Sequence, residues 1–200
     1  MPSCPLRQKL RVKIDRDGPP FIAAATVPSI VAAVTGHRRA AGALTVLPLA
    51  VAAFFRDPDR APDLGCPANR DVLLAPADGK VMHVGDPQPG VAPEGDWQQI
   101  SIFLALSDVH MNRTPMAGRV VSVTHRPGRY LAAFKAESAH QNERSEIVLT
   151  DEAGGEPHTI VFRQIGGMAA RRVVARIGVG DQLAAGERIG LMRFGSRMDV

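Results

Sequence analysis

The sequence predicts a mainly β protein, an antiparallel β-sandwich or barrel of hammerhead-like or lipoyl-like type, with an N-terminal helical hairpin that associates with a membrane. Two apolar stretches of about fifteen residues each lie within the first 56 residues. From residue 71 onward, short β-branched runs are separated by glycine, proline and aspartate. No long segment with a helical period follows residue 56. The predicted boundary therefore divides a basic and apolar segment, 1–56, from a β-rich domain, 57–200.

The two apolar stretches are Phe21–Thr35 and Ala40–Phe55, and basic residues precede and separate them. Each is shorter than the ~20 residues that cross a bilayer as a straight helix. We therefore expect a helical hairpin that dips into one leaflet, with its basic flanks at anionic headgroups. A pair of buried, alanine-rich helices is the alternative, because length alone does not separate the two.

The β-rich part contains six runs that predict strands. They cover residues 71–74, 79–84, 99–104, 119–123, 145–149 and 158–162. Residues 56–70 are rich in proline, aspartate and arginine and predict a loop, and residues 129–140 leave room for a turn of helix. A weak repeat places a proline before a Gly-basic-Val strand start at 75–81 and again at 114–120.

Net charge and residue composition indicate which kinds of partner the protein could bind. A formal net charge of +4 suits an anionic surface, either phospholipid or nucleic acid. Basic residues are not clustered with aromatic ones, which disfavours nucleic acid. The two cysteines, Cys4 and Cys66, form neither a metal-ligand pattern nor a disulfide framework, so a reduced, cytosol-facing location fits. The sequence has no metal-binding motif and no phosphate-binding P-loop, and we expect no metal.

A Gly-Ser pair at Gly195-Ser196 offers an unusual chemistry. A serine hydroxyl can attack the preceding carbonyl, turn the amide into an ester and, after elimination, split the chain. The serine then becomes a pyruvoyl group, an electrophilic carbonyl that no ordinary side chain provides. A lone Gly-Ser is more often a turn after a strand, so the surrounding sequence must decide.

Five blocks surround this pair in order, and together they resemble the short-chain phosphatidylserine decarboxylase proenzymes. The resemblance extends from about residue 16 to the C-terminus. The blocks are Phe54-Phe55-Arg56-Asp57-Pro58, Ala75-Pro76-Ala77-Asp78-Gly79-Lys80-Val81, Asp108-Val109-His110-Met111-Asn112-Arg113, Asn142-Glu143-Arg144 and Phe194-Gly195-Ser196-Arg197-Met198-Asp199.

The resemblance implies cleavage between Gly195 and Ser196, with Ser196 as the precursor of a covalent pyruvoyl cofactor. It also implies that Asp78 and His110 activate the serine, in an arrangement where an acid orients an imidazole that takes the hydroxyl proton. Many long-chain relatives carry a second histidine three residues after the first, where this chain has Arg113. The planar guanidinium of Arg113 suits the phosphate or carboxylate of a substrate. His140 is a spare candidate base.

The implied reaction is the pyruvoyl-dependent decarboxylation of phosphatidylserine to phosphatidylethanolamine. The implied partners are phosphatidylserine in an anionic membrane and the chain's own cleaved small subunit, and no nucleic acid. The implied location is the cytoplasmic side of the cell membrane, peripheral or monotopic. The chain has only four residues after Ser196, so we expect that the rest of the small subunit is missing from it.

Other functions remain open. One is a non-catalytic, membrane-tethered lipoyl-like binding module, although no Met-Lys attachment site is present. A second is a pyruvoyl decarboxylase of a soluble amino acid, which the apolar N-terminal segment disfavours. A third keeps the chemistry and changes the lipid to another phosphoserine lipid, such as archaetidylserine.

Overall fold

The chain forms a helical unit and a β-rich unit. A computed structural model describes residues 11–60, 72–151, 157–168, 173–193 and 196–200. The described residues up to 60 form the helical unit, and those from 72 onward belong to the β-rich unit.

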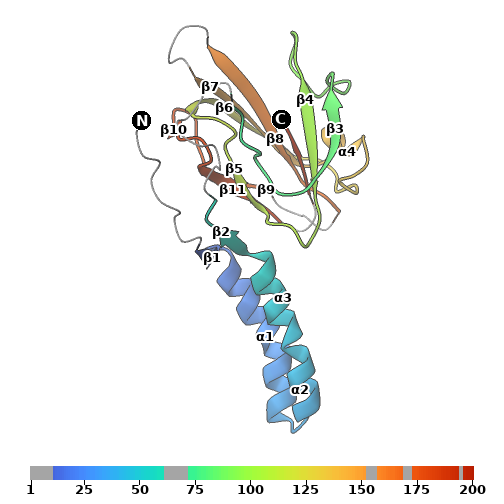
Figure 1. Ribbon diagram of the computed structural model, residues 1–200. Helices are drawn as coiled ribbons and strands as arrows, with labels where there is room; N and C mark the ends of the chain where they lie inside the picture. Colours follow the sequence, from blue (N-terminus) through green and yellow to red (C-terminus); the bar gives the residue numbers. More distant parts are fainter. Residues whose placement is uncertain (1–10, 61–71, 152–156, 169–172, 194–195) are drawn as a thin grey trace. The chain divides into compact units, whose positions relative to one another are not determined.

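The helical unit is a hairpin closed at its base by two short strands (Figure 1). Its elements are β1 (Val12–Ile14), α1 (Gly18–Val34), α2 (Arg38–Leu44), α3 (Val46–Phe54) and β2 (Arg56–Pro58). β1 pairs antiparallel with β2, and α1 packs against both α2 and α3. The loop predicted from residue 56 therefore begins instead with a strand. Residues 61–70 of that loop lie outside the described residues.

The base of the hairpin is packed by aromatic rings. Phe55 is fully buried, and its ring stacks on Phe21 at 5.3 Å between centroids. Phe54 packs edge-on against Phe55 at 5.1 Å. A side chain at Gly18 would overlap Phe55, which explains the glycine at the start of α1. The first sequence block, 54–58, therefore stabilises the hairpin.

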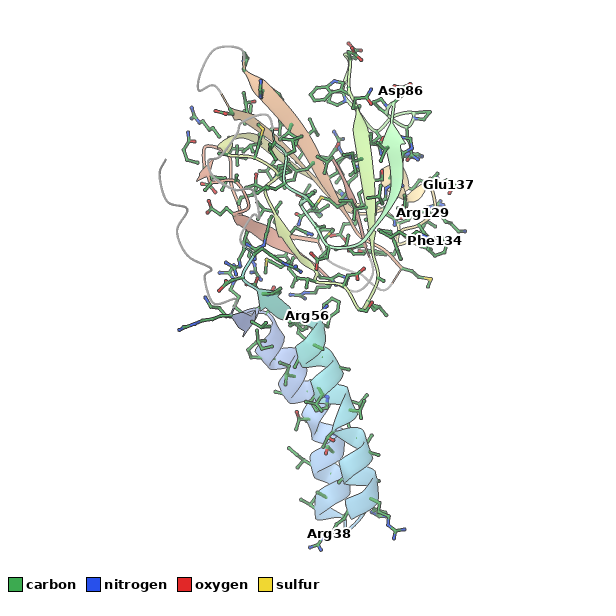
Figure 2. All side chains as sticks on the ribbon, viewed as in Figure 1. Arg38, Arg56, Asp86, Arg129, Phe134 and Glu137 are labelled. Carbon is green, nitrogen blue, oxygen red and sulfur yellow. The ribbon has the colours of Figure 1, made fainter. Side chains whose placement is uncertain are left out.

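The long sides of the hairpin are apolar and exposed. The exposed residues of its helices include Val27, Ile30, Val31, Val34, Val46, Leu47 and Leu49. Figure 2 shows Arg38 and Arg56 at opposite ends of this apolar surface. No helix within the described ranges has both the length and the hydropathy needed to span a membrane.

The β-rich unit contains a seven-stranded antiparallel sheet. Its strand order is β10-β6-β7-β8-β12-β4-β3. The bounds in that order are Gln182–Leu183, Gly118–Arg126, Arg144–Asp151, His158–Ile165, Ser196–Asp199, Gln99–Leu104 and Lys80–Gly85. The last strand in the chain, β12, is thus inserted between β8 and β4 near the middle of the sheet.

A three-stranded antiparallel sheet completes the unit. Its order is β5 (Met111–Arg113), β11 (Arg188–Met192) and β9 (Val173–Ala175). One core unites the two sheets, since Met198 and Phe162 of the large sheet cluster with Ile189 and Met192 of β11. The opposite face of the large sheet carries a second cluster, in which Ile165 packs with a residue of α4 (Ser138–Gln141) and with Val91.

The fold class is therefore confirmed as mainly β and antiparallel, with two sheets around a common core, and the barrel alternative is wrong. In the described residues the large sheet does not close, because β10 and β3 are its edges and do not pair with each other. Five predicted strands correspond to β3, β4, β6, β7 and β8, and the helical turn corresponds to α4. The run from Val72 to Leu74 forms no strand. The strands β5, β9, β11 and β12 were not predicted, whereas β10 lies where residues 179–190 predict a short strand between two turns.

The repeated Pro-x-x-Gly-basic-Val pattern marks two close approaches between strands. A Cβ atom at Gly79 would overlap the carbonyl oxygen of Phe103, and one at Gly118 would lie 2.7 Å from that of Thr150. In both places the glycine lets a strand begin against the backbone of its neighbour, and its positive φ favours glycine further.

A Gly79→Ala substitution should therefore destabilise the β-rich unit. We expect the free energy of unfolding to fall by about 2–3 kcal/mol, because a backbone oxygen cannot move aside as a flexible side chain can. Denaturant unfolding measures this loss. Gly178→Ala is the matched control, since a Cβ there meets only Asp181 at 4.0 Å. Equal stability of the two variants would contradict the account.

Candidate active site

Ser196 lies in the interior of the β-rich unit, where it begins β12 and is fully buried. It lies opposite Leu104 of β4, and two residues further on Met198 points into the shared core. Because alternate residues of a strand face the same side, the Ser196 side chain faces that core as well. Its hydroxyl finds no hydrogen-bond partner within the described part of the chain. Gly195, the predicted cleavage partner, lies outside the described residues.

An unpaired buried hydroxyl is unusual, because buried polar groups are nearly always hydrogen-bonded. Each such group destabilises the fold by about 1–3 kcal/mol relative to a bonded one. The hydroxyl of Ser196 is therefore desolvated and has no bond to break before it reacts. Such a hydroxyl suits a nucleophile better than a structural serine.

The strand that follows Ser196 is held from both edges and from its outer face. β12 pairs with β4 on one side and with β8 on the other. On the face away from the core, Arg197 is almost fully buried. Its guanidinium donates to Asp199 Oδ1 at 2.5 Å, to Gln88 Oε1 at 2.7 Å and to Ser101 Oγ at 2.9 Å. These contacts fix the backbone immediately after the reactive serine.

His110 is a buried base beside β11, the strand that precedes β12 in the chain. All six histidines lie in the described residues, and His110 alone is fully buried. The residue directly precedes β5, and its carbonyl accepts a bond of 3.3 Å from the amide of Met192, four residues before Ser196. The ring Nδ1 lies 3.0 Å from the carbonyl oxygen of Asp108. A carbonyl only accepts, so Nδ1 carries the proton, and Nε2 is the basic nitrogen when the ring is neutral.

Asp78 is half-buried and lies two residues before β3, the strand that pairs with β4. The segment is also tied to β5, because the Arg113 amide donates to the Pro76 carbonyl at 2.9 Å. The role of Asp78 in activating the serine stays a prediction.

Arg113 ends β5, three residues after His110. Its guanidinium donates to the carbonyl of Gly186 at 3.0 Å, so part of its donor capacity serves the β10–β11 turn. Residues an odd number of positions apart in a strand face opposite sides, which places Arg113 and His110 on different faces of β5. Its role in binding the substrate stays a prediction.

Two buried amides that we did not predict also face the core. Gln164 of β8 donates from Nε2 to Asn112 Oδ1 of β5 at 2.8 Å, and both residues are fully buried. Asn112 Nδ2 and Gln164 Oε1 have no partner among the described residues. Two features of the sequence could have indicated them: Asn112 is a polar residue two positions after His110, and Gln164 is a glutamine inside an apolar strand. The two facing sheets thus contribute His110, Asn112, Gln164 and Ser196 to the interior between them.

The Asn142-Glu143-Arg144 block holds the backbone next to this interior. Asn142 is fully buried, donates to the carbonyls of Leu131 at 2.8 Å and Gly166 at 2.7 Å, and accepts from the Leu131 amide at 2.8 Å. The Glu143 carbonyl accepts from the Gly166 amide at 2.8 Å, and its carboxylate accepts from Tyr130 at 2.8 Å. Gly166 directly follows β8, the strand beside β12. The hydrogen bonds of this block therefore hold the chain in place at the end of β8.

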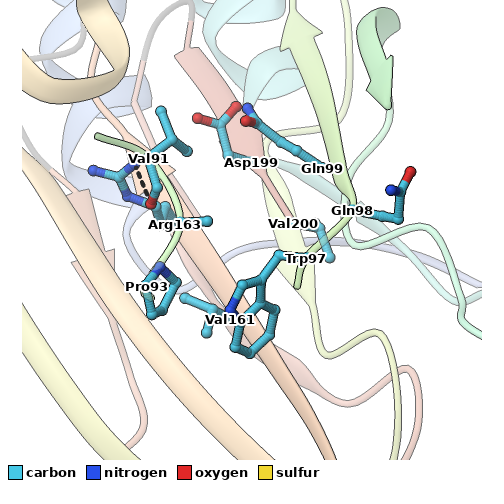
Figure 3. Close-up of a pocket in the computed structure, with 10 residues that line it drawn as sticks. Val91, Pro93, Trp97, Gln98, Gln99, Val161, Arg163, Asp199 and Val200 are labelled. Carbon is cyan, nitrogen blue, oxygen red and sulfur yellow. Dashed lines mark hydrogen bonds between the residues drawn. The ribbon is translucent and has the colours of Figure 1, made fainter. Parts of the chain in front are cut away.

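A pocket lies on the other face of the large sheet. It is lined mainly by apolar side chains, with Arg163 and Asp199 among the polar ones (Figure 3). Arg163 donates to the Val91 carbonyl at 3.1 Å. Burial lowers the pKa of the Arg163 guanidinium, and the neighbouring charge of Glu146 opposes this effect. The pocket contains none of the predicted catalytic residues. In the described residues no cluster of three or more His, Cys, Asp or Glu is placed to hold a metal ion.

Comparison with known proteins identifies the family. The phosphatidylserine decarboxylase family model matches residues 47–200. The chain is similar to the phosphatidylserine decarboxylase proenzyme of Solibacter usitatus, with 43% identity over 165 residues, 80% of this chain and 73% of that protein. The proenzyme of Mycolicibacterium smegmatis is 38% identical over 186 residues, 92% of this chain and 76% of that protein. That of Geotalea daltonii is 37% identical over 191 residues, 94% and 85% of the two chains. With its match over most of the length and a buried, unpaired serine at the predicted point of cleavage, this chain belongs to the phosphatidylserine decarboxylase family.

Proposed function

We propose that this chain is a proenzyme that cleaves itself between Gly195 and Ser196 and then decarboxylates phosphatidylserine to phosphatidylethanolamine. The observation that carries the proposal is the Ser196 hydroxyl, which is buried and unpaired in the interior that also holds His110. Family membership supplies the substrate class.

Self-cleavage proceeds in two stages. The Ser196 Oγ–H gives its proton to His110 Nε2, and Oγ forms a bond to the Gly195 carbonyl carbon. The C–N bond breaks, the nitrogen takes the proton, and an ester remains. Loss of the Ser196 Cα proton then breaks the Cβ–Oγ bond and releases Gly195 as a carboxylate. The dehydroalanine left at position 196 takes up water and releases ammonia, which gives the pyruvoyl group.

The residues present fit this cofactor, because its precursor is a serine in a desolvated interior on a strand held from both edges. Once formed, the pyruvoyl group supplies an electron-withdrawing carbonyl for the loss of carbon dioxide. Arg197 keeps position 196 in place through its bonds to Asp199, Gln88 and Ser101. His110 can return a proton to the substrate carbon, and the bond from its Nδ1 to the Asp108 carbonyl holds the ring. The two pieces of the cleaved chain remain together as subunits.

The test uses the purified chain. Intact mass should show a fragment of residues 1–195 and a second fragment that begins with a pyruvoyl group at position 196. Vesicles that contain phosphatidylserine should release carbon dioxide and gain phosphatidylethanolamine. An intact chain that decarboxylates the lipid would overturn the mechanism, and a cleaved chain that does not act on the lipid would overturn the substrate.

We also propose that the helical hairpin inserts into the bilayer surface on the cytoplasmic side. Val34 is 77% exposed and Leu49 is 67% exposed, and such apolar side chains favour hydrocarbon. The 17 residues of α1 are about 26 Å long, less than the ~30 Å hydrocarbon core. Arg38 and Arg39 at the tip suit anionic headgroups.

Introducing charge on the hairpin should weaken membrane binding. We expect the Val34→Asp/Leu49→Asp chain to bind anionic vesicles at least about tenfold more weakly, because two apolar side chains no longer enter the hydrocarbon. Vesicle flotation measures the bound fraction. Val84→Asp/Val179→Asp is the matched control, with positions 70% and 68% exposed in the β-rich unit. Equal loss of binding in both chains would argue against insertion of the hairpin.

A further inference from the structure

The paired amides of Asn112 and Gln164 leave one donor and one acceptor unused. One bond of 2.8 Å joins the two groups, and the remaining Asn112 Nδ2 and Gln164 Oε1 have no partner among the described residues. If both amide groups were turned over, the roles would exchange, but one N–H₂ and one carbonyl would still be left over. The pair therefore presents one unused donor group and one unused acceptor in either orientation.

The unused groups lie beside position 196. Gln164 is directly opposite Met198 in the β8–β12 ladder, so it is a diagonal neighbour of Ser196 on the same face. Long side chains reach across such a diagonal. Asn112 is two positions from His110 and faces the same side of β5. A molecule that reacts at position 196 would therefore meet the amide pair and the base together.

Buried amide groups rarely stay unpaired, because desolvation without a bond is unfavourable. In the uncleaved chain nothing in the described residues satisfies them. A bound molecule that satisfies both would offer one acceptor and one donor. An α-amino acid group has this arrangement, since its carboxylate and ammonium are attached to one carbon.

We propose that the Asn112–Gln164 pair binds the amino-acid headgroup of the substrate, an inference that rests on the proposed function. The carboxylate accepts from the unused amide N–H, and the ammonium donates to the unused amide oxygen. Neutral amides suit this task better than an arginine. A full ion pair would stabilise the carboxylate more in the ground state than in the transition state, where its charge moves into the breaking bond.

The test measures capture of an amine at position 196 rather than turnover. The cleaved wild-type chain is incubated with sodium cyanoborohydride and either O-phospho-L-serine or O-phosphoethanolamine, which lacks the carboxylate. The mass of the fragment that begins at position 196 reports the captured amine, counted with or without loss of carbon dioxide. We expect Asn112→Leu and Gln164→Leu to capture phosphoserine about 10–100-fold less than wild type. Capture of phosphoethanolamine should change less than about threefold. The same comparison with phosphatidylserine vesicles separates a lipid headgroup from a free amino acid.

Two further chains make the outcome decisive. Gln99→Leu removes an equally buried amide from the opposite face of the large sheet and should keep the wild-type preference. Asn112→Asp keeps the size of the side chain, and its negative charge should also depress phosphoserine capture. An unchanged preference in the Asn112 and Gln164 variants would overturn the inference. Folded variants that no longer cleave would overturn it as well, because the pair would then serve cleavage. A wild-type chain that never cleaves would instead count against the proposed function.

Discussion

A Ser196→Ala chain is expected to remain one intact polypeptide, with no pyruvoyl group and no decarboxylation of phosphatidylserine. The substitution removes the only atom that can attack the Gly195 carbonyl from this position. It should not weaken the fold, because the buried hydroxyl makes no hydrogen bond to a described residue. Removing an unsatisfied buried group is neutral or stabilising. We therefore expect an inactive chain whose free energy of unfolding equals or exceeds that of the wild-type precursor. Intact mass, lipid analysis and denaturant unfolding check the three parts.

Ser138→Ala is the control for this prediction. Ser138 is also fully buried, but it lies in α4 and its hydroxyl donates to the carbonyls of Ala133 at 3.0 Å and Lys135 at 2.6 Å. Its removal should lower stability by about 1–3 kcal/mol and leave cleavage in place. The opposite pattern, with a destabilised Ser196→Ala chain and an uncleaved Ser138→Ala chain, would mean that Ser196 is a structural serine.

A His110→Gln chain is expected to cleave about 10²–10⁴-fold more slowly than wild type, the usual contribution of a positioned general base. Glutamine has nearly the same size, and its amide N–H can replace the bond from Nδ1 to the Asp108 carbonyl. The substitution therefore removes the basic nitrogen with little change in packing. Samples quenched at increasing times and separated by gel electrophoresis give the rate.

His83→Gln is the matched control, because the His83 ring makes a comparable local contact, from Nε2 to the Asp86 carbonyl at 2.8 Å. It should cleave at the wild-type rate. If His110→Gln also cleaves at that rate, the base is another group. The exposed His140, held on α4, would then be the next histidine to replace.

The strands that the sequence predicted are those in which β-branched residues repeat over five or more positions. β4 and β8 follow this pattern, and both were found. β12 has the sequence Ser-Arg-Met-Asp, which looks like a polar turn. It becomes a strand because its backbone pairs with β4 and β8, while Arg197 and Asp199 neutralise each other inside the sheet. Local sequence preference does not contain the pairing with these distant strands, so the central strand was not predicted.

Some residues of the candidate site could be predicted from the sequence and others could not. His110 and Ser196 were predicted because their blocks resemble those of a family, and their catalytic roles stay predictions. Both residues are fully buried in the structure. Asn112 and Gln164 are 52 positions apart, and only the facing of two sheets joins them. A single glutamine in a strand usually indicates a solvent-facing position. The sequence therefore did not reveal that Gln164 is buried, and only the three-dimensional structure shows it. A barrel was among the expected folds because the number and spacing of strands in a sequence do not reveal whether the two edge strands of a sheet pair with each other.

The central position of β12 has a consequence for the cut protein. If the fragment that begins at position 196 were removed, the large sheet would separate into a four-stranded part, β10-β6-β7-β8, and a two-stranded part, β4-β3. In the proposed cleaved protein, the fragment that begins at position 196 would therefore supply a central strand of the large sheet and join its two parts. A synthetic peptide with the sequence of β12 could be tested for binding to a chain of residues 1–195, and chemically altered residues could then be placed at the reactive position.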